Sequence, residues 1–242
     1  MLWTIKKPED IFAEVMADFQ NVFGGDLVSL ILYGSVAAGH YVPGKSDINS
    51  LIILTEAGLD NLEKAMDVVG KWRKKRVAGI FMTHAYILSS LDAFPVEFLA
   101  MKLNHRLLFG ADVLSGLTIL PHDLRLQLER ELKGKMFHLR QGFLECGGKE
   151  KGLRQLIKRS LDAFVPLFKA LLFLRGNEIP PGRRELVKSL ARAYSLNPEV
   201  LLRCIDLHEG KGRSTAGEIK PLFKLYQGEI AQVLALIDKL EV

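Results

Sequence analysis

The segment from Leu32 to Leu54, LYGSVAAGHYVPGKSDINSLIIL, holds the residues whose types and spacing could do chemistry. Gly34 follows an apolar run and can adopt a positive φ, and the next residue, Ser35, is of a type that caps helices. A helix N-terminus offers unpaired backbone amides and the positive end of the helix dipole, which is where phosphates bind. The Gly34-Ser35 pair therefore predicts a phosphate-binding turn that leads into a short helix.

Asp47 and Asn49 form a second polar group twelve residues further along the chain. Side chains alternate along a strand, so these two would project from one face while Ile48 points to the other. Two oxygen-bearing side chains beside a phosphate-binding turn are half of a magnesium site. Lys45 and Ser46 precede them, and we expect both to line the nucleotide site, although a loop lysine is often simply solvated.

A third metal ligand is expected from a neighbouring strand, and Glu97 supplies a carboxylate within the apolar segment FPVEFLAM. An acid between Val96 and Phe98 is costly to bury unless a metal or a partner neutralises it. Glu97 is therefore the second acid expected in the site. Simpler interpretations remain for each group: an ordinary strand-to-helix turn at 34–35, a capping pair at 47–49, and a surface acid at 97.

The elements that must position these residues alternate between strands and helices in the first half of the chain. Dense apolar runs predict strands, and amphipathic spacing predicts helices. We expect strands at 27–33, 48–55, 77–88 and 96–101, and helices at 8–23 and 57–72.

The second half has helical periodicity throughout and almost no strand-like alternation. Glycine and proline pairs, and a glycine-bounded loop at 210–217, separate the expected helices. These lie near 123–145, 151–175, 182–194, 197–207 and 218–240. Strands followed by helices predict an α+β protein, with a mixed-sheet domain at 1–118 and an all-α helical bundle at 119–242.

Composition narrows the classes of function. The only cysteines, Cys146 and Cys204, form neither a CxxC motif nor a spacing typical of zinc ligands. No apolar stretch is long enough to span a membrane, and the first residues lack the pattern of a signal peptide, so we expect a cytoplasmic protein. Residues 1–118 carry 11 basic and 13 acidic side chains, whereas residues 119–242 carry 22 and 15. A basic second half favours an anionic partner.

The chain resembles the nucleotidyltransferase superfamily, the fold of DNA polymerase β, the aminoglycoside nucleotidyltransferases and the antitoxin-type nucleotidyltransferases. The resemblance rests on an apolar strand ending in Gly34-Ser35, a loop, the sequence Ser46-Asp47-Ile48-Asn49, and the later acid Glu97. It covers roughly the first 110 residues.

This resemblance implies a reaction and a role for each residue. In the family, a pair of aspartates and one further acid hold two Mg²⁺ ions, which align a nucleoside triphosphate, here expected to be ATP, for attack by a hydroxyl. Gly34 and Ser35 would contact phosphates, Asp47 and Asn49 would be metal ligands, and Glu97 would be a ligand or general base. Asn49 stands where the family usually has its second aspartate, so both metal affinity and activity should fall.

Other functions fit the same residues. The main alternative is a nucleotide-binding or interaction protein that kept the fold and lost efficient chemistry. Asn49 is the residue that supports this alternative. An RNA-binding partner with a basic contact surface is a third. Arg203 and His208 have the spacing seen in HEPN-type ribonucleases. Five residues apart on a helix, the two side chains would face different ways, so they could form such a site only if the partner in a homodimer completes it. His105 and Arg106 follow Glu97 closely and are candidates to line the cleft.

Overall fold

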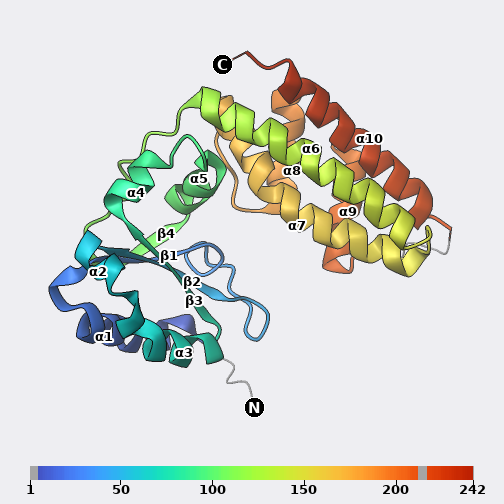
Figure 1. The fold of residues 1–242 in the computed structure, drawn as a ribbon. Helices are drawn as coiled ribbons and strands as arrows, with labels where there is room; N and C mark the ends of the chain where they lie inside the picture. Colours follow the sequence, from blue (N-terminus) through green and yellow to red (C-terminus); the bar gives the residue numbers. More distant parts are fainter. Residues whose placement is uncertain (1–4, 212–216, 242) are drawn as a thin grey trace. The chain divides into compact units, whose positions relative to one another are not determined.

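The computed structural model describes residues 5–211 and 217–241. The chain divides into two compact units between Ile119 and Leu120, one residue beyond the expected boundary, and each unit is described by itself. The first contains a mixed sheet with helices, and the second is helical, so the α+β class expected from the sequence is confirmed (Figure 1). Most of the loop expected at 210–217 lies outside the described residues. None of the described helices is long and apolar enough to cross a membrane.

The sheet of the first unit has four strands in the order β3-β2-β1-β4. The central pair, β1 and β2, is antiparallel, and Tyr33 at the end of β1 lies opposite Asn49 at the start of β2. β4 is antiparallel to β1 and places His105 on the other side of Tyr33, whereas β3 runs parallel to β2. The last residues of β1 and the first of β2 and β4 therefore meet at one end of the sheet. The strands are β1 (Leu27–Tyr33), β2 (Ile48–Leu54), β3 (Val77–Thr83) and β4 (His105–Gly110).

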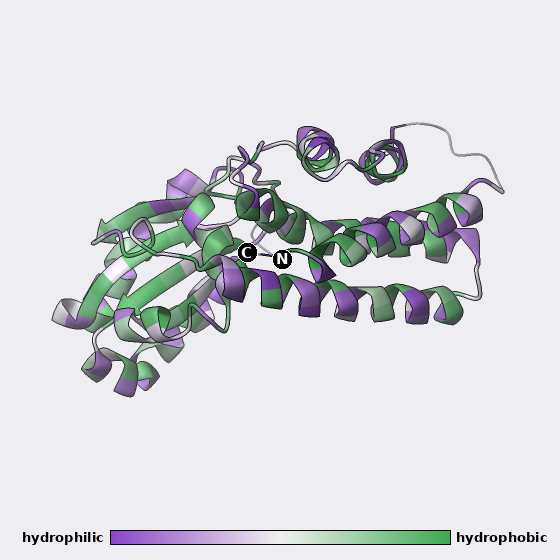
Figure 2. Ribbon diagram, turned by 90° about the horizontal axis from the view of Figure 1, so that it is seen from above, coloured by the Kyte–Doolittle hydropathy of each residue, from purple (hydrophilic) through white to green (hydrophobic). Residues whose placement is uncertain are grey.

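Helices α1 (Phe12–Phe23) and α3 (Met66–Lys74) pack on one face of this sheet, and Figure 1 shows α4 (His84–Ser89) and α5 (Pro95–Leu103) on the other side of the strands. The first face is held by a core that includes Phe19 and Trp72, both almost fully buried. The strands are correspondingly hydrophobic in Figure 2. Shorter segments complete the unit: η1 (Pro8–Ile11), η2 (Gly24–Asp26), α2 (Glu56–Asp60) and η3 (Leu62–Ala65).

Several elements of the first unit differ from the expectation. The strand expected at 77–88 ends at Thr83, because the Thr83 hydroxyl accepts a hydrogen bond from the Tyr86 amide and starts α4. The strand expected at 96–101 is wrong. Those residues form α5, which begins with Pro95 at its first position, where proline favours a helix. The strand β4 was not expected, and the helix expected at 57–72 is divided among α2, η3 and α3.

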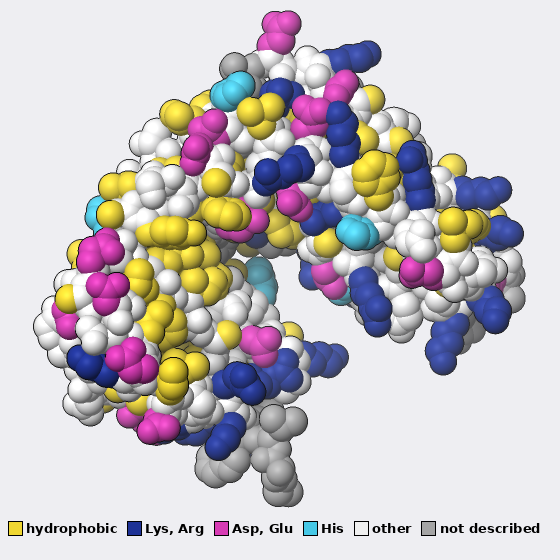
Figure 3. All heavy atoms as spheres, viewed as in Figure 1, with side chains coloured by type: hydrophobic (Ala, Val, Ile, Leu, Met, Phe, Trp, Pro, Cys, Tyr) yellow, Lys and Arg dark blue, Asp and Glu magenta, His cyan; other side chains and the backbone are white. Residues whose placement is uncertain are grey.

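The second unit consists of five α-helices within its described residues. Each lies within two residues of the expected bounds: α6 (Pro121–Glu145), α7 (Glu150–Leu174), α8 (Arg183–Tyr194), α9 (Glu199–Glu209) and α10 (Ile219–Asp238). Their core includes Phe164, which contacts Tyr226 edge to face, and Phe223, on which the partly buried Phe143 stacks. Figure 3 shows many lysine and arginine side chains on one face of this unit, as its sequence requires.

Candidate functional site

The turn after β1 is built around Gly34. Gly34 has a φ of 75°, donates its amide to the Asn104 carbonyl oxygen at 3.2 Å, and accepts the Ala38 amide at 3.0 Å. The His40 amide closes the turn on the Ser35 carbonyl oxygen at 2.8 Å. Residues 34–39 form this turn and no helix follows, so the expectation that Ser35 caps a short helix is wrong.

Three successive backbone amides of this turn, those of Ser35, Val36 and Ala37, donate no hydrogen bond to any acceptor in residues 5–211 and 217–241. All three residues are partly exposed. Neighbouring N–H groups presented by a turn form a concave anion-binding surface without any side chain. The turn therefore offers backbone donors of the kind that phosphate oxygens accept, although it does not begin a helix.

Asn49 lies beside this turn. A β-carbon on Gly34 would stand 3.2 Å from the Asn49 side-chain nitrogen, so the side chain covers the glycine closely. Ile48, its neighbour, is buried on the opposite face with the core of α1 and α3. The structure thus brings together Gly34 and Asn49, two of the residues expected in the site.

Asp47 is held by Arg76, a residue that the sequence did not single out. The Arg76 Nε donates to Asp47 Oδ1 at 2.9 Å, and the two other guanidinium nitrogens donate to the carbonyl oxygens of Gly44 and Lys45 at 3.1 and 2.8 Å. Both side chains are partly open to solvent: Arg76 is 37% exposed and Asp47 is 56% exposed. In the sequence, Arg76 ends the basic run KWRKKR, which looks like an ordinary helix terminus.

The loop that carries Lys45 and Ser46 is fixed by its own hydrogen bonds. The Ser46 hydroxyl oxygen accepts the Val42 amide at 3.0 Å, and the Ser46 amide donates to the Val42 carbonyl oxygen at 2.9 Å. The Tyr41 hydroxyl donates to the Ile5 carbonyl oxygen at 3.0 Å. Ser46 thus has a structural role in closing the loop, while the Lys45 side chain is exposed.

Glu97 does not lie on a strand beside Asp47. It is an exposed residue in the first turn of α5, so strand alternation does not place it next to Asn49. The strands that flank β2 are β1 and β3, and neither contains an aspartate or glutamate.

The residues at this end of the sheet do not fit a two-ion magnesium site. Asp47 is already paired with a guanidinium, the Asp112 carboxylate is paired with His105, and Asn49 is a neutral amide. Within the described part of the chain, no three His, Cys, Asp or Glu side chains are grouped so as to hold a metal ion.

The first two residues of β4, His105 and Arg106, point in different directions. His105 lies opposite Tyr33, and its ring nitrogens contact the Lys102 carbonyl oxygen at 3.0 Å and the Asp112 carboxylate at 3.1 Å. Burial alone would raise the pKa of Asp112, but hydrogen bonds from His105 and two backbone amides lower it overall. Arg106 instead stacks over Phe12, 5.3 Å from the ring centroid, on the core side of the sheet.

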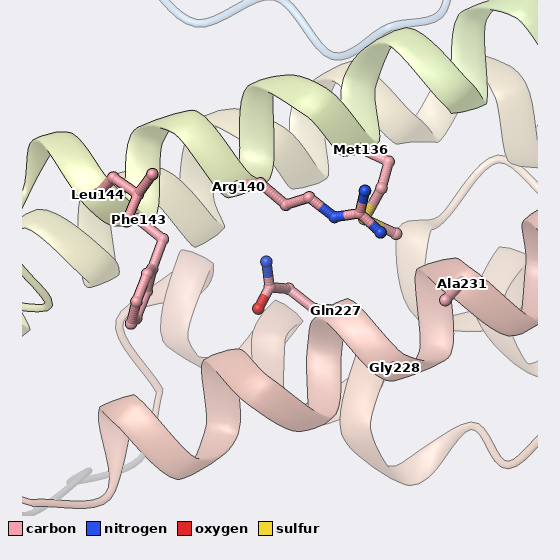
Figure 4. Close-up of a pocket in the computed structure, with 7 residues that line it drawn as sticks. All are labelled: Met136, Arg140, Phe143, Leu144, Gln227, Gly228 and Ala231. Atoms are coloured by element: carbon pink, nitrogen blue, oxygen red, sulfur yellow. The ribbon is translucent and has the colours of Figure 1, made fainter.

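In the helical unit, His208 contacts Asp162 at 3.0 Å, and Arg183 donates to the same carboxylate at 2.7 Å. His208 is thus part of a surface ion-pair cluster, and Arg203 is exposed on the same helix. A separate open groove of about 450 Å³ lies between α6 and α10, with Arg140 and Gln227 facing each other across it (Figure 4). Its lining contains no acidic residue, so the groove offers neither a carboxylate ligand for a metal nor a carboxylate general base.

Comparison with known proteins gives a likeness of fold. No family model matches the chain, and no curated protein matches it in sequence. A solved structure of spectinomycin adenyltransferase AAD(9) from Enterococcus faecialis, with ATP and spectinomycin, is similar over 90% of this chain and 99% of its own length. The TM-score is 0.52 and the sequence identity 12%. The chain therefore shares the fold of this adenyltransferase, a mixed-sheet domain followed by a helical one.

Proposed function

We propose that this protein binds a nucleoside triphosphate, with ATP as the first nucleotide to test, through the turn after β1. The observation that carries the proposal is the row of three amides at Ser35, Val36 and Ala37, for which the described residues provide no acceptor. They follow a glycine at positive φ, at the end of the sheet where Asn49 also lies. The fold, shared with an adenyltransferase solved with ATP, supports the same assignment.

We propose further that the protein is a nucleotide-binding or interaction protein in which nucleotidyl transfer is weak or absent. Two-ion catalysis depends on several carboxylates that hold the ions and offset their charge. Here Asn49 brings no charge, Asp47 is paired with Arg76, and the strands beside β2 carry no acid. A triphosphate would be held mainly by backbone amides, which need no metal to act.

Mg²⁺-dependent transfer of a nucleoside monophosphate to a hydroxyl acceptor is the second candidate, favoured by the likeness to an enzyme solved with both ATP and spectinomycin. In that case Asp47 and Asn49 would be metal ligands, with Glu97 as the further acid brought in by a movement of α5. The acceptor would be held by the helical unit, whose excess of basic residues makes a cationic acceptor less suitable.

Isothermal titration calorimetry with ATP, in EDTA and then in MgCl₂, distinguishes these candidates. The first predicts binding in EDTA that survives Asp47→Ala, and the second predicts binding that requires Mg²⁺ and is lost in Asp47→Ala. Gly34→Ala should weaken ATP binding at least tenfold, since a methyl group there displaces Asn49 and distorts the turn. Gly39→Ala is the matched control, because Gly39 also has positive φ but has open space around it. Equal affinity in all four proteins would refute both candidates.

A further inference from the structure

We infer that Arg76 is an internal cation that takes the place of a metal ion at Asp47, so that the wild-type site excludes divalent cations. The inference concerns the same site as the proposed function. It rests on that function only for its consequence that a bound triphosphate would meet Arg76 in place of a metal ion. Its core, the competition between a guanidinium and a metal for one carboxylate, can be tested without nucleotide.

The contacts of Arg76 have the form of a cation site. Its guanidinium donates separate hydrogen bonds to three oxygens: a carboxylate oxygen of Asp47 and the carbonyl oxygens of Gly44 and Lys45, at 2.8–3.1 Å. Carboxylate and backbone carbonyl oxygens are also the ligands that hard divalent cations select. The planar guanidinium matches such a set because its donors diverge in a fixed fork.

The backbone of Arg76 is held so that the side chain reaches these oxygens. Arg76 has a φ of 62°, a conformation uncommon for a residue other than glycine. Its amide donates to the Arg73 carbonyl oxygen at 3.1 Å, and its carbonyl oxygen accepts the Ile48 amide at 2.9 Å. The same residue thus joins the end of α3 to the start of β2 through its backbone and to the loop before β2 through its side chain.

A divalent ion at Asp47 would bind beside this guanidinium, which already donates to the Oδ1 oxygen of the carboxylate. No strand of the sheet contains an aspartate or glutamate, and the other carboxylate near this end, Asp112, is paired with His105. A metal bound beside Arg76 would be repelled by its charge, and a metal without Asp47 would have Asn49 as its protein side-chain ligand. The charge that a metal would supply near the turn is therefore already supplied by the chain.

The test is Mn²⁺ binding by the whole chain, measured by the electron paramagnetic resonance signal of free Mn²⁺. We expect weak binding by the wild type and at least tenfold tighter binding by Arg76→Gln, because the neutral amide frees Asp47. Lys74→Gln is the matched control: it removes one positive charge from the same basic run at an exposed position, and it should leave Mn²⁺ affinity unchanged. Adding Asp47→Asn to Arg76→Gln should abolish the gain.

Asn49→Asp sharpens the comparison. Alone it should increase Mn²⁺ affinity little, and together with Arg76→Gln it should exceed the sum of the two single effects, since the second carboxylate is useful once the first is free. If Arg76→Gln does not fold, Arg76→Lys keeps the charge and loses the fork, and should bind Mn²⁺ better than the wild type does. Wild-type binding as tight as that of the Arg76 variants would overturn the inference. Loss of ATP binding in EDTA with this Mn²⁺ pattern intact would refute the nucleotide proposal alone.

Discussion

The Asn49 side chain lies so close to Gly34 that a β-carbon on the glycine would stand 3.2 Å from its nitrogen. This contact joins the end of β1 to the start of β2, and it explains why the turn needs a glycine for space as well as for its positive φ. An amide is well suited to this place, because it is polar and yet does not repel an approaching phosphate as a carboxylate would.

Gly34→Ala should destabilise the protein for two separable reasons. The left-handed backbone costs an alanine about 1–2 kcal/mol, and the new methyl group must push Asn49 away. Gly39→Ala has the first cost without the second, because Gly39 has a φ of 71° and a β-carbon added there would meet no atom within 4 Å. Urea unfolding of both variants measures the difference. If the two lose the same stability, the close packing of Asn49 on Gly34 is wrong.

Asp18→Ala should lower the stability of the protein by weakening the packing of α1 against α3. The Asp18 carboxylate accepts the buried Trp72 indole N–H at 2.8 Å and the Lys71 ammonium at 2.6 Å. Without it the indole donor is left unpaired, at a cost of about 2 kcal/mol. The exposed Glu14 also pairs with Lys71, so Glu14→Ala is the control and should have a much smaller effect in thermal unfolding. A reversed order would contradict the packing of α3 described above.

Gly110→Ala tests the strand that the sequence did not reveal. An added β-carbon would lie 1.9 Å from the Val28 carbonyl oxygen, so β1 and β4 would have to separate at this end. We expect a loss of stability of at least about 3 kcal/mol, as for other severe overpacking. Gly116→Ala has open space around it and should be nearly neutral. Equal stability of the two variants, measured by urea unfolding, would mean that β4 is not paired as described.

Glu229 should make the stability of the protein depend on pH. It is 9% exposed on α10, its Oε2 has no hydrogen-bond partner among the described residues, and burial raises its pKa above the usual value for glutamate. A carboxyl whose pKa is higher in the folded state ionises more readily once unfolded. The free energy of unfolding should therefore fall as pH rises from about 4.5 through the folded-state pKa, and then level off.

Glu229→Gln should remove this dependence and stabilise the protein by about 1 kcal/mol at pH 8, since a neutral amide costs less to bury. Chemical unfolding of both proteins at pH 5 and pH 8 gives the comparison. A wild-type protein that gains stability more steeply than the variant between these pH values would contradict the burial of this carboxyl.

Local patterns in the sequence predicted much of this structure, and long-range contacts account for what they missed. The run LVSLILY is apolar enough that β1 was expected with the bounds it has. The apolar residues of PVEFLAMKL fit the spacing of a buried strand as well as that of a helix. Pro95, at the first helical position, was the signal in the sequence that favoured α5. The short strand HRLLFG carries two polar residues at its start and gains its place by pairing with β1.

The site followed the same division. Gly34 and Asn49, which the structure brings together, were both expected from their types and spacing along one segment, as was Asp47. Their binding of nucleotide or metal stays a prediction. Arg76 could not be found in this way, because it reaches Asp47 from 29 positions away through a backbone conformation that no residue preference indicates. Glu97 was placed by a strand that is in fact a helix.

Whether the turn after β1 binds a triphosphate can be decided by titrating the ¹⁵N-labelled protein with ATP in EDTA and following the amide-resolved NMR spectra. We predict that the amide resonances of Ser35, Val36 and Ala37 shift progressively with ATP and lie among the largest changes, because their N–H groups gain phosphate acceptors. Saturable ATP binding that leaves these three resonances in place, or no binding at all, would contradict this assignment.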